Sequence, residues 1–280
     1  MSGTLYLCAT PIGNLEDITL RVLRLLREVD IIAAEDTRHT RKLLNHFEIT
    51  TPLTSYHDHN RRVKGGHLLS LLQSGKDIAL VTDAGMPAIS DPGADIVQLC
   101  HASGISVTCA PGASAQSAAL ALSGFGGGRF CFEGFLPRET KPRRERIAAL
   151  AGETRTSIFY EAPHRLHETV TELAAQLDPG RGIAVISELT KLYEKAVVGP
   201  LAVVADEMTQ LVPRGEFVII IDGAREEDLR AAERADFENM TIAEHVAFYT
   251  SAGLDQKAAM KAAARDRGVA KSVIYKDMHK

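Results

Sequence analysis

The stretch Val81-Thr82-Asp83-Ala84-Gly85-Met86-Pro87-Ala88-Ile89-Ser90-Asp91-Pro92-Gly93 decides how this chain is organised. The apolar run from Asp77 to Val81 precedes it and is typical of a buried parallel strand. Apolar residues at helical spacing, from Ile96 to Cys100, follow it. The stretch is therefore predicted to be a strand-to-helix loop at the carboxyl end of a strand, where open α/β sheets place their ligands.

Two interpretations of this loop remain open at this point. Gly and Pro restrict its shape while Asp83 and Asp91 supply hydrogen-bond acceptors, as a ligand site requires. An ordinary turn with capping aspartates explains the same residues equally well. The connection is long for a strand-to-helix loop, and this length favours a function.

Outward from this loop, strand, loop and helix alternate about five times over the first 123 residues, which predicts a mainly parallel sheet. The expected strands are Thr4 to Ala9, Asp30 to Ala34, Leu53 to Tyr56, Asp77 to Val81 and Ile105 to Cys109. The first helix is expected from Ile18 to Val29. The later helices are expected to end near His46, Leu72, Ala102 and Leu122.

Gly124, Gly126, Gly127 and Gly128 interrupt the pattern and are interpreted as a linker between domains. A second sheet is expected beyond it, with strands at 130–135, 156–160, 183–187, 195–199 and 217–221. The predicted fold class is thus α/β, with an N-terminal domain at 1–123, a C-terminal domain at 124–224 and a helical C-terminal extension at 225–280.

The extension begins with an acidic, Ala- and Arg-rich segment, 225–238, interpreted as a solvated helix or linker. From Thr241 onward, helical patterns broken at Gly253 and Gly268 are compatible with a small helix-turn-helix-like module. Residues 256–280 hold seven Lys or Arg against two Asp, and a solvated amphipathic helix explains this equally well.

The overall composition is that of an ordinary globular protein, with 45% hydrophobic and 24% charged residues. A net charge of −4 means that any nucleic-acid surface must be a local patch. Met1 to Asn14 lacks the basic lead of a signal peptide, and no stretch approaches the roughly 18 apolar residues of a membrane helix. The four cysteines, without ligand-like spacing, are expected to be buried free thiols in a reducing cytosol.

Several familiar catalytic patterns are incomplete. Gly124 to Arg129 does not match a dinucleotide-binding loop, Gly75-Lys76 lacks the rest of a Walker loop, and His167-Glu168 lacks the second His of a zinc protease. The segment His57-Asp58-His59 could bind a metal, but alternate residues of an extended chain point to opposite sides, so a polar loop is favoured. The remaining strand-end loops suit a cationic ligand with an adenosine part, and an acid-lined hydrolase pocket nearly as well.

Six motifs in order carry a resemblance to a known family. They are 9–15 (ATPIGNL), 34–38 (AEDTR), 82–93 (TDAGMPAISDPG), 111–115 (PGASA), 160–165 (YEAPHR) and 188–191 (ELTK). Together they resemble the tetrapyrrole-methylase superfamily over roughly residues 3–223, and within it the branch that methylates ribosomal RNA. Small-molecule relatives carry a Gly-Pro-Gly-Asp type of loop where this chain has Thr10 to Asn14, and this departure favours the RNA branch.

The resemblance implies S-adenosylmethionine bound between two α/β domains, a homodimer, and a cytoplasmic protein that is not bound to a membrane. It implies 2′-O-methylation of a cytidine ribose in the decoding region of 16S rRNA, on free rRNA or on the small ribosomal subunit, with no metal. By position, the residues expected at the methyl donor are Pro11, Asp83, Ala84, Gly85, Pro87, Ser114 and Ala115.

The catalytic group is left open, because a cap or an ion pair explains each carboxylate equally well. The candidates are Glu35, Asp36, Glu161, Glu188 and Lys191. Candidate RNA contacts are Arg38, Arg41, Lys141, Arg143, Arg144, Arg146, His164 and Arg165. The alternatives are a methyltransferase acting on a tetrapyrrole or other small molecule, a metal-dependent phosphohydrolase using Asp83, Asp91 and 57–59, and a non-catalytic RNA-binding module.

Overall fold

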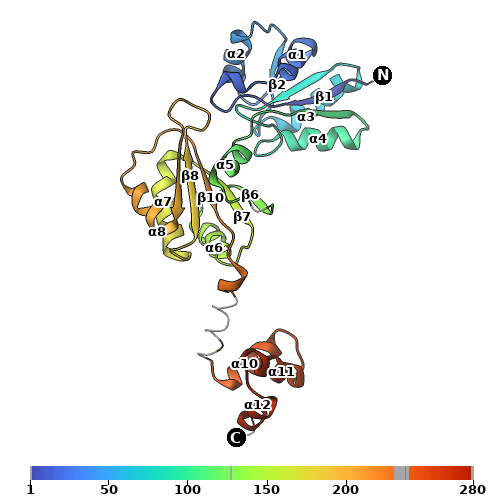
Figure 1. The fold of residues 1–280 in the computed structure, drawn as a ribbon. Coiled ribbons are helices and arrows are strands. Elements are labelled where there is room, and N and C mark those ends of the chain that lie inside the picture. Colours follow the sequence, from blue (N-terminus) through green and yellow to red (C-terminus); the bar gives the residue numbers. More distant parts are fainter. Residues whose placement is uncertain (1, 127, 230–236, 238–239, 279–280) are drawn as a thin grey trace. The chain divides into compact units, whose positions relative to one another are not determined.

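The first sheet is entirely parallel, with strand order β3-β2-β4-β1-β5 (Figure 1). Its strands are β1 (Thr4–Cys8), β2 (Ile31–Ala34), β3 (Leu53–Ser55), β4 (Ile78–Val81) and β5 (Ser106–Ala110). The connecting helices are η1 (Leu15–Asp17), α1 (Leu20–Glu28), α2 (Thr37–His46), α3 (Arg61–Gln73) and α4 (Gly93–Ala102). The predicted alternation of strand and helix is confirmed.

Both faces of this sheet are covered, which explains why β4 is an unbroken apolar run. Ala79 and Val81 pack into one core with α1 and α2, whereas Ile78 and Leu80 pack into another with α3 and α4. All four residues are buried, as in parallel sheets sandwiched between helices.

The second sheet is mixed, with strand order β6-β7-β10-β8-β9. Its strands are β6 (Phe130–Phe135), β7 (Thr156–Glu161), β8 (Gly182–Ser187), β9 (Lys195–Pro200) and β10 (Phe217–Ile221). Its helices are α6 (Thr140–Leu150), η2 (Pro163–Arg165), α7 (Leu166–Gln176) and α8 (Leu201–Thr209). Strand β10 runs antiparallel to both β7 and β8, so Phe217 at its amino end lies beside Glu161 and Ser187 at their carboxyl ends.

Helix α5 (Ala115–Ser123) follows the last strand of the first sheet but packs on the second. Its buried Ala119 lies in one core with Ile158, Ala184 and Ile220. The loop before α5 is therefore where the chain passes from one sheet to the other; Ser114 is the N-cap at its end, and Ala115 is the first residue of the helix.

The C-terminal helices α10 (Ile242–Ser251), α11 (Gln256–Asp266) and α12 (Lys271–Met278) share a core of their own around Val246, Met260 and Ile274. Thr241 and Glu244 form a capping box at the start of α10, in which each side chain bonds the other residue's backbone N–H. The predicted helical extension is confirmed.

The computed structural model describes residues 2–126, 128–229, 237 and 240–278. Gly127 of the expected linker and most of the expected solvated segment, 230–236 and 238, lie outside these residues. Two compact units are present, one of Met1–Ala148 with Thr156–Asp222 and one of Ala149–Arg155 with Gly223–Lys280. The three-domain division remains a proposal. None of the helices in the described ranges is long and apolar enough to cross a bilayer.

All four cysteines are free thiols, as expected, but not all of them are buried. Burial raises the pKa of Cys8 to about 12 and that of Cys100 to about 11, so both stay protonated. Cys109 is exposed, contrary to the prediction, because β5 lies at the edge of its sheet and leaves one side open.

Candidate functional site

The organising loop is held against the loop after β1 by a reciprocal pair of backbone hydrogen bonds. Thr10 N–H donates to Gly85 O at 2.9 Å, and Gly85 N–H donates to Thr10 O at 3.0 Å. Gly85 has φ +83°, and a Cβ there would lie 3.3 Å from the Ile12 side chain. Because β1 and β4 are neighbours in the sheet, these two loops meet at its carboxyl edge.

The two aspartates of the organising loop have different roles. Asp91 accepts hydrogen bonds from the N–H groups of Ala88 and Gly93, both at 2.8 Å, so it braces the loop, as the structural interpretation expected. Asp83 accepts one from Asp36 N–H at 3.0 Å and thereby joins the loop after β4 to the loop after β2.

A cavity of about 220 Å³ lies where the strand-end loops of the first sheet approach those of the second. Four of the seven residues expected at the methyl donor line it: Ala84, Gly85, Ser114 and Ala115. Pro11 and Asp83 line a second cavity instead, and Pro87 is buried and lines neither cavity.

This cavity is called the donor cavity below, after that expectation, and several of its other lining residues were not predicted from the sequence. They include Ile12, Met86, Gln116, Gly215, Glu216 and Val218. Gln116 Oε1 is buried without a hydrogen-bond partner in the described part of the chain. Gly215, with φ +69°, lies directly against the Glu188 carboxylate. Gly215 could not be assigned to this site from the sequence, because nothing local indicates the antiparallel direction of β10, which brings its amino end to this edge.

The loop after β8 adds an ion pair and strained backbone to the donor cavity. Lys191 Nζ lies 2.9 Å from Glu188 Oε1, and both residues line the cavity. Glu188 and Thr190 have φ of +51° and +66°, which is costly for residues other than glycine. Such conformations cluster at functional sites.

Two other candidate catalytic carboxylates hold the first sheet's loops. Glu35 accepts a hydrogen bond from Thr82 Oγ1 at 2.7 Å. Asp36 is the N-cap of α2, accepting from Arg38 N–H at 2.8 Å, and it pairs with the Arg38 guanidinium at 2.7 Å. The hydrogen bonds from Arg38 hold the pKa of Asp36 well below its usual range.

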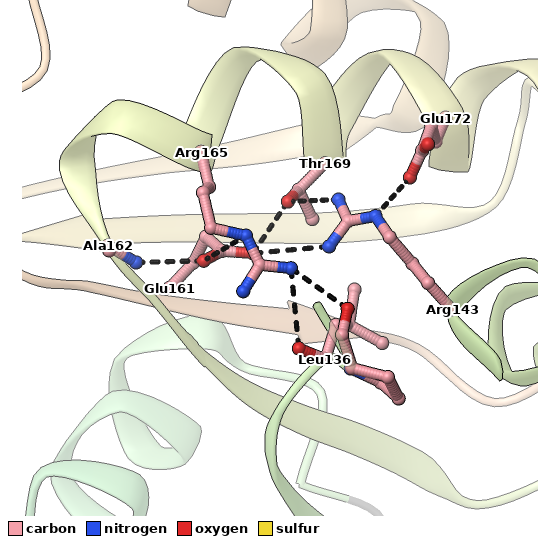
Figure 2. Close-up of polar contacts among 8 residues, drawn as sticks. Leu136, Arg143, Glu161, Ala162, Arg165, Thr169 and Glu172 are labelled. Atoms are coloured by element: carbon pink, nitrogen blue, oxygen red, sulfur yellow. Dashed lines mark hydrogen bonds and ion pairs between the residues drawn. The ribbon is translucent and has the colours of Figure 1, made fainter. Parts of the chain in front are cut away.

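Glu161 lies in a buried network of side chains from β7, α6 and α7, shown in Figure 2. It is 1% exposed, accepts from Thr169 Oγ1 at 2.6 Å and from Ala162 N–H at 2.9 Å, and lies 3.9 Å from Arg143. Arg143 donates to Thr169 Oγ1 at 2.7 Å and to Glu172 at 2.5 Å. Arg143 was expected to contact RNA. The structure corrects this, because the residue is 3% exposed and its charge is compensated by carboxylates.

Arg165 was also expected at the RNA, and it is mostly committed to the same network. Its guanidinium donates to the carbonyls of Leu136 and Pro137 at 3.3 and 3.1 Å and lies 3.7 Å from Glu161 (Figure 2). The network therefore holds the chain beyond β6 and the loop after β7 in place. Tyr160, the residue before Glu161, lines the donor cavity.

The remaining candidate RNA contacts differ in exposure. Arg146 pairs with Glu133, and Lys141 lies 4.0 Å from Glu145. The exposed ones are Arg38, Arg41, Lys141, Arg144 and His164.

The segment 57–59 forms a polar turn. Asn60 Oδ1 accepts from His57 N–H at 2.9 Å, and Asn60 Nδ2 lies 3.1 Å from His57 Nε2. No group of three potential metal ligands occurs in the described ranges.

The second cavity, of about 380 Å³, is lined by α2 and by the loops after β1 and β4. Consecutive residues face different cavities: Asp83 lines the second and Ala84 the donor cavity, and Gly13 lines the second and Ile12 the donor cavity. The loops joined by the Thr10–Gly85 hydrogen bonds thus form a wall common to both.

Comparison with known proteins gives consistent matches. The family profile of Tetrapyrrole (Corrin/Porphyrin) Methylases matches residues 4–205. Proteins named ribosomal RNA small subunit methyltransferase I are 47% identical in Bacillus subtilis, over 99% of this chain and 94% of that protein, and 46% identical in Synechocystis sp., over 98% and 96%.

Solved structures share the fold at low identity. A cobalt precorrin-4 methyltransferase superposes with a TM-score of 0.59 at 19% identity, over 78% of this chain and 94% of the other. Diphthine synthase superposes with a TM-score of 0.59 at 15% identity, over 79% of this chain and 90% of the other.

Proposed function

The chain belongs to the tetrapyrrole methylase family and, within it, to the ribosomal RNA small subunit methyltransferase I group; from this membership we propose that it methylates the 2′-oxygen of a cytidine ribose in the decoding region of 16S rRNA. The proposed methyl donor is S-adenosylmethionine, and the proposed substrate is 16S rRNA or the small ribosomal subunit in the cytoplasm. The observation that supports this most is the donor cavity.

The chemistry of the donor cavity fits this donor. Ile12, Leu189 and Val218 provide apolar walls for an adenosine, and the Glu216 carboxylate complements a cation. The unpartnered Gln116 Oε1 is an acceptor for an ammonium or amino group. Burial raises the pKa of Tyr160, so its phenol remains an O–H donor at neutral pH.

The chain's own contribution to catalysis is mainly positioning. When bound, S-adenosylmethionine supplies a methyl group on an electrophilic sulfonium. Holding the ribose oxygen in line with that methyl group supplies much of the rate, and a nearby base assists proton removal. Of the five candidates, Glu188 and Lys191 line the donor cavity, so we propose that the base or oxyanion partner is one of these two.

Donor binding is tested by titration calorimetry of Gly85→Val. We expect S-adenosylmethionine binding to be weakened at least about tenfold, because a branched side chain at φ +83° strains the loop and meets Ile12. Gly66→Val is the matched control, since Gly66 is an exposed helical residue with nothing within 4 Å of an added Cβ. Equal affinities of the two variants would remove the donor from this cavity.

The substrate is tested by mapping 2′-O-methyl groups on 16S rRNA from cells lacking the gene. One cytidine methylation should disappear and return on complementation with the wild-type chain. An unchanged map would reject the RNA assignment. The homodimer is part of the same proposal, and light scattering of the purified chain should give twice the monomer mass.

A further inference from the structure

The second cavity is lined by basic side chains, a buried hydroxyl and a carboxylate that do not line the donor cavity. Its volume of about 380 Å³ is many times the roughly 15 Å³ that a single water requires, so it has room for a sizeable ligand. It lies on the other side of the loops that form the wall of the donor cavity. A group bound in it would therefore be close to the donor while remaining outside the donor's own site.

One face of α2 supplies cationic and donor groups to this cavity. His39, Lys42 and His46 are spaced by three and four residues, which places them along one side of the helix, and all three line the cavity. Each is exposed, and within the described ranges none of them has a carboxylate partner. An ammonium and two imidazoles that no carboxylate pairs with are available to donate hydrogen bonds to a phosphate.

A buried hydroxyl on the same helix lacks a hydrogen-bond partner. Thr40 is 2% exposed and lines the cavity, yet its Oγ1 has no partner among the described residues. A buried hydroxyl is normally satisfied, and one that is not indicates a missing ligand or water. This observation is independent of the charges on α2, and it also indicates a polar ligand.

The wall of the cavity that is shared with the donor cavity carries a carboxylate. Asp83 accepts one hydrogen bond from Asp36 N–H, which leaves lone pairs free to accept others. Carboxylates at the ends of parallel strands commonly bind ribose hydroxyls. Cationic and donor groups on α2 and an acceptor at the shared wall match the phosphate and the sugar of one nucleotide.

We propose that the second cavity is the subsite for a nucleotide that flanks the methylated one in the RNA strand: Lys42, His39 and His46 bind its phosphate, Thr40 Oγ1 donates to a phosphate oxygen, and Asp83 accepts from its ribose. The inference rests on the proposed function, because it assigns this nucleotide to the substrate RNA. The loops joined at Thr10 and Gly85 lie between this nucleotide and the methyl donor, so the ribose that accepts the methyl group is the neighbouring one, which enters the donor cavity.

The experiment uses the full-length chain and cytidine 3′,5′-bisphosphate as the probe, titrated by calorimetry over a series of salt concentrations. The double variant Lys42→Gln/His46→Gln should lose at least about tenfold in affinity, because charge-assisted hydrogen bonds to phosphate disappear. Arg62→Gln on α3 is the matched control, because it also removes one positive charge. Arg62 is exposed and does not line the cavity, so bisphosphate affinity should stay within about twofold, the range of surface substitutions.

Thr40→Val provides a second test, because it keeps the shape of the side chain and removes only the hydroxyl. It should weaken bisphosphate binding while S-adenosylmethionine affinity stays at the wild-type value. Bisphosphate affinity unchanged in both Thr40→Val and the double variant would overturn the subsite, whether or not the protein methylates rRNA. Affinity lost in those variants would support the subsite even if no rRNA methylation were found, a result that would reject only the proposed function.

Discussion

Helices α2 and α6 are both rich in basic residues, but they use their charges differently. In α6, Lys141, Arg143 and Arg146 have carboxylate partners, and Arg143 is buried beside its own. In α2, Arg38 pairs with the N-cap Asp36, whereas Arg41 and Lys42 have no ion-pair partner in the described part of the chain. A basic run in a sequence therefore shows that charge is present, and the acidic side chains around it decide whether RNA can use it.

The largest effect that this comparison predicts is on stability. Arg143→Met should reduce the free energy of unfolding by about 3 kcal/mol, because it removes one of the two guanidinium groups beside the buried Glu161 and the direct partner of Glu172. Arg144→Met, one position further along α6 and exposed, should change it by no more than about 0.5 kcal/mol. Urea titration of both full-length variants measures the difference.

A double variant checks the cause of that loss. Adding Glu161→Gln to Arg143→Met removes the buried carboxylate that has lost one of its two nearby cations, and it should restore part of the lost stability. Equal stabilities of Arg143→Met and Arg144→Met would show that the network in Figure 2 contributes nothing, and α6 would again be a candidate RNA surface.

The second prediction concerns the salt dependence of RNA binding. Replacing Arg38, Arg41 and Lys42 of α2 by Gln should flatten the slope of log affinity against log salt by up to about 2, at about 0.7 per lost phosphate contact. The same change at Lys141, Arg144 and Arg146 of α6 should alter the slope by less than about 1, since two of these residues pair with carboxylates. Filter binding of a single-stranded RNA measures both slopes. Equal changes in the two sets would contradict the comparison.

The smallest effect concerns Asp36, the carboxylate that Arg38 of α2 does engage. An aspartate in an unfolded chain has a pKa of about 3.9, and hydrogen bonds from Arg38 lower that of Asp36 in the folded protein. The cap's contribution to stability is therefore complete above the unfolded value and is lost only as the pH falls through the lowered folded value. NMR of the Arg38 amide should show no titration near pH 4. A shift of the Arg38 amide signal with a midpoint near the unfolded pKa of about 3.9 would show that the cap is weak. The variant Asp36→Asn gives the pH dependence of this signal in the absence of the carboxylate.

Local patterns were enough to predict most of the fold. The apolar run of β4 and the Pro and Gly residues around it identify a strand-end loop, and the structure places this loop at the edge of a parallel sheet. The family resemblance predicted Ala84, Gly85, Ser114 and Ala115 at one site, and the carboxyl ends of parallel strands, which meet at one edge of the sheet, explain why these residues line a common cavity.

Features that depend on contacts distant in sequence could not be predicted. Gly215 and Glu216 reach the donor cavity only because β10 runs antiparallel to its neighbours, which its apolar sequence does not indicate. Arg143 looks like any surface arginine until Glu161 and Glu172 are brought beside it. Cys109 lies in a strand with apolar neighbours, but its exposure depends on β5 being an edge strand.

The position of α5 has a consequence for how the chain folds during synthesis. All strands of the first sheet are complete at Ala110, so this sheet can form while later residues are still being translated. Helix α5 ends at Ser123, but β10, against which it packs, begins only at Phe217. At ribosomal speeds of about 5–20 residues per second, roughly 5–20 s pass between the synthesis of α5 and that of β10. During this interval the face of α5 that will pack on the second sheet is exposed, and it carries mainly alanines. It therefore exposes less apolar area to other chains, and promotes aggregation less, than a face of larger apolar residues would.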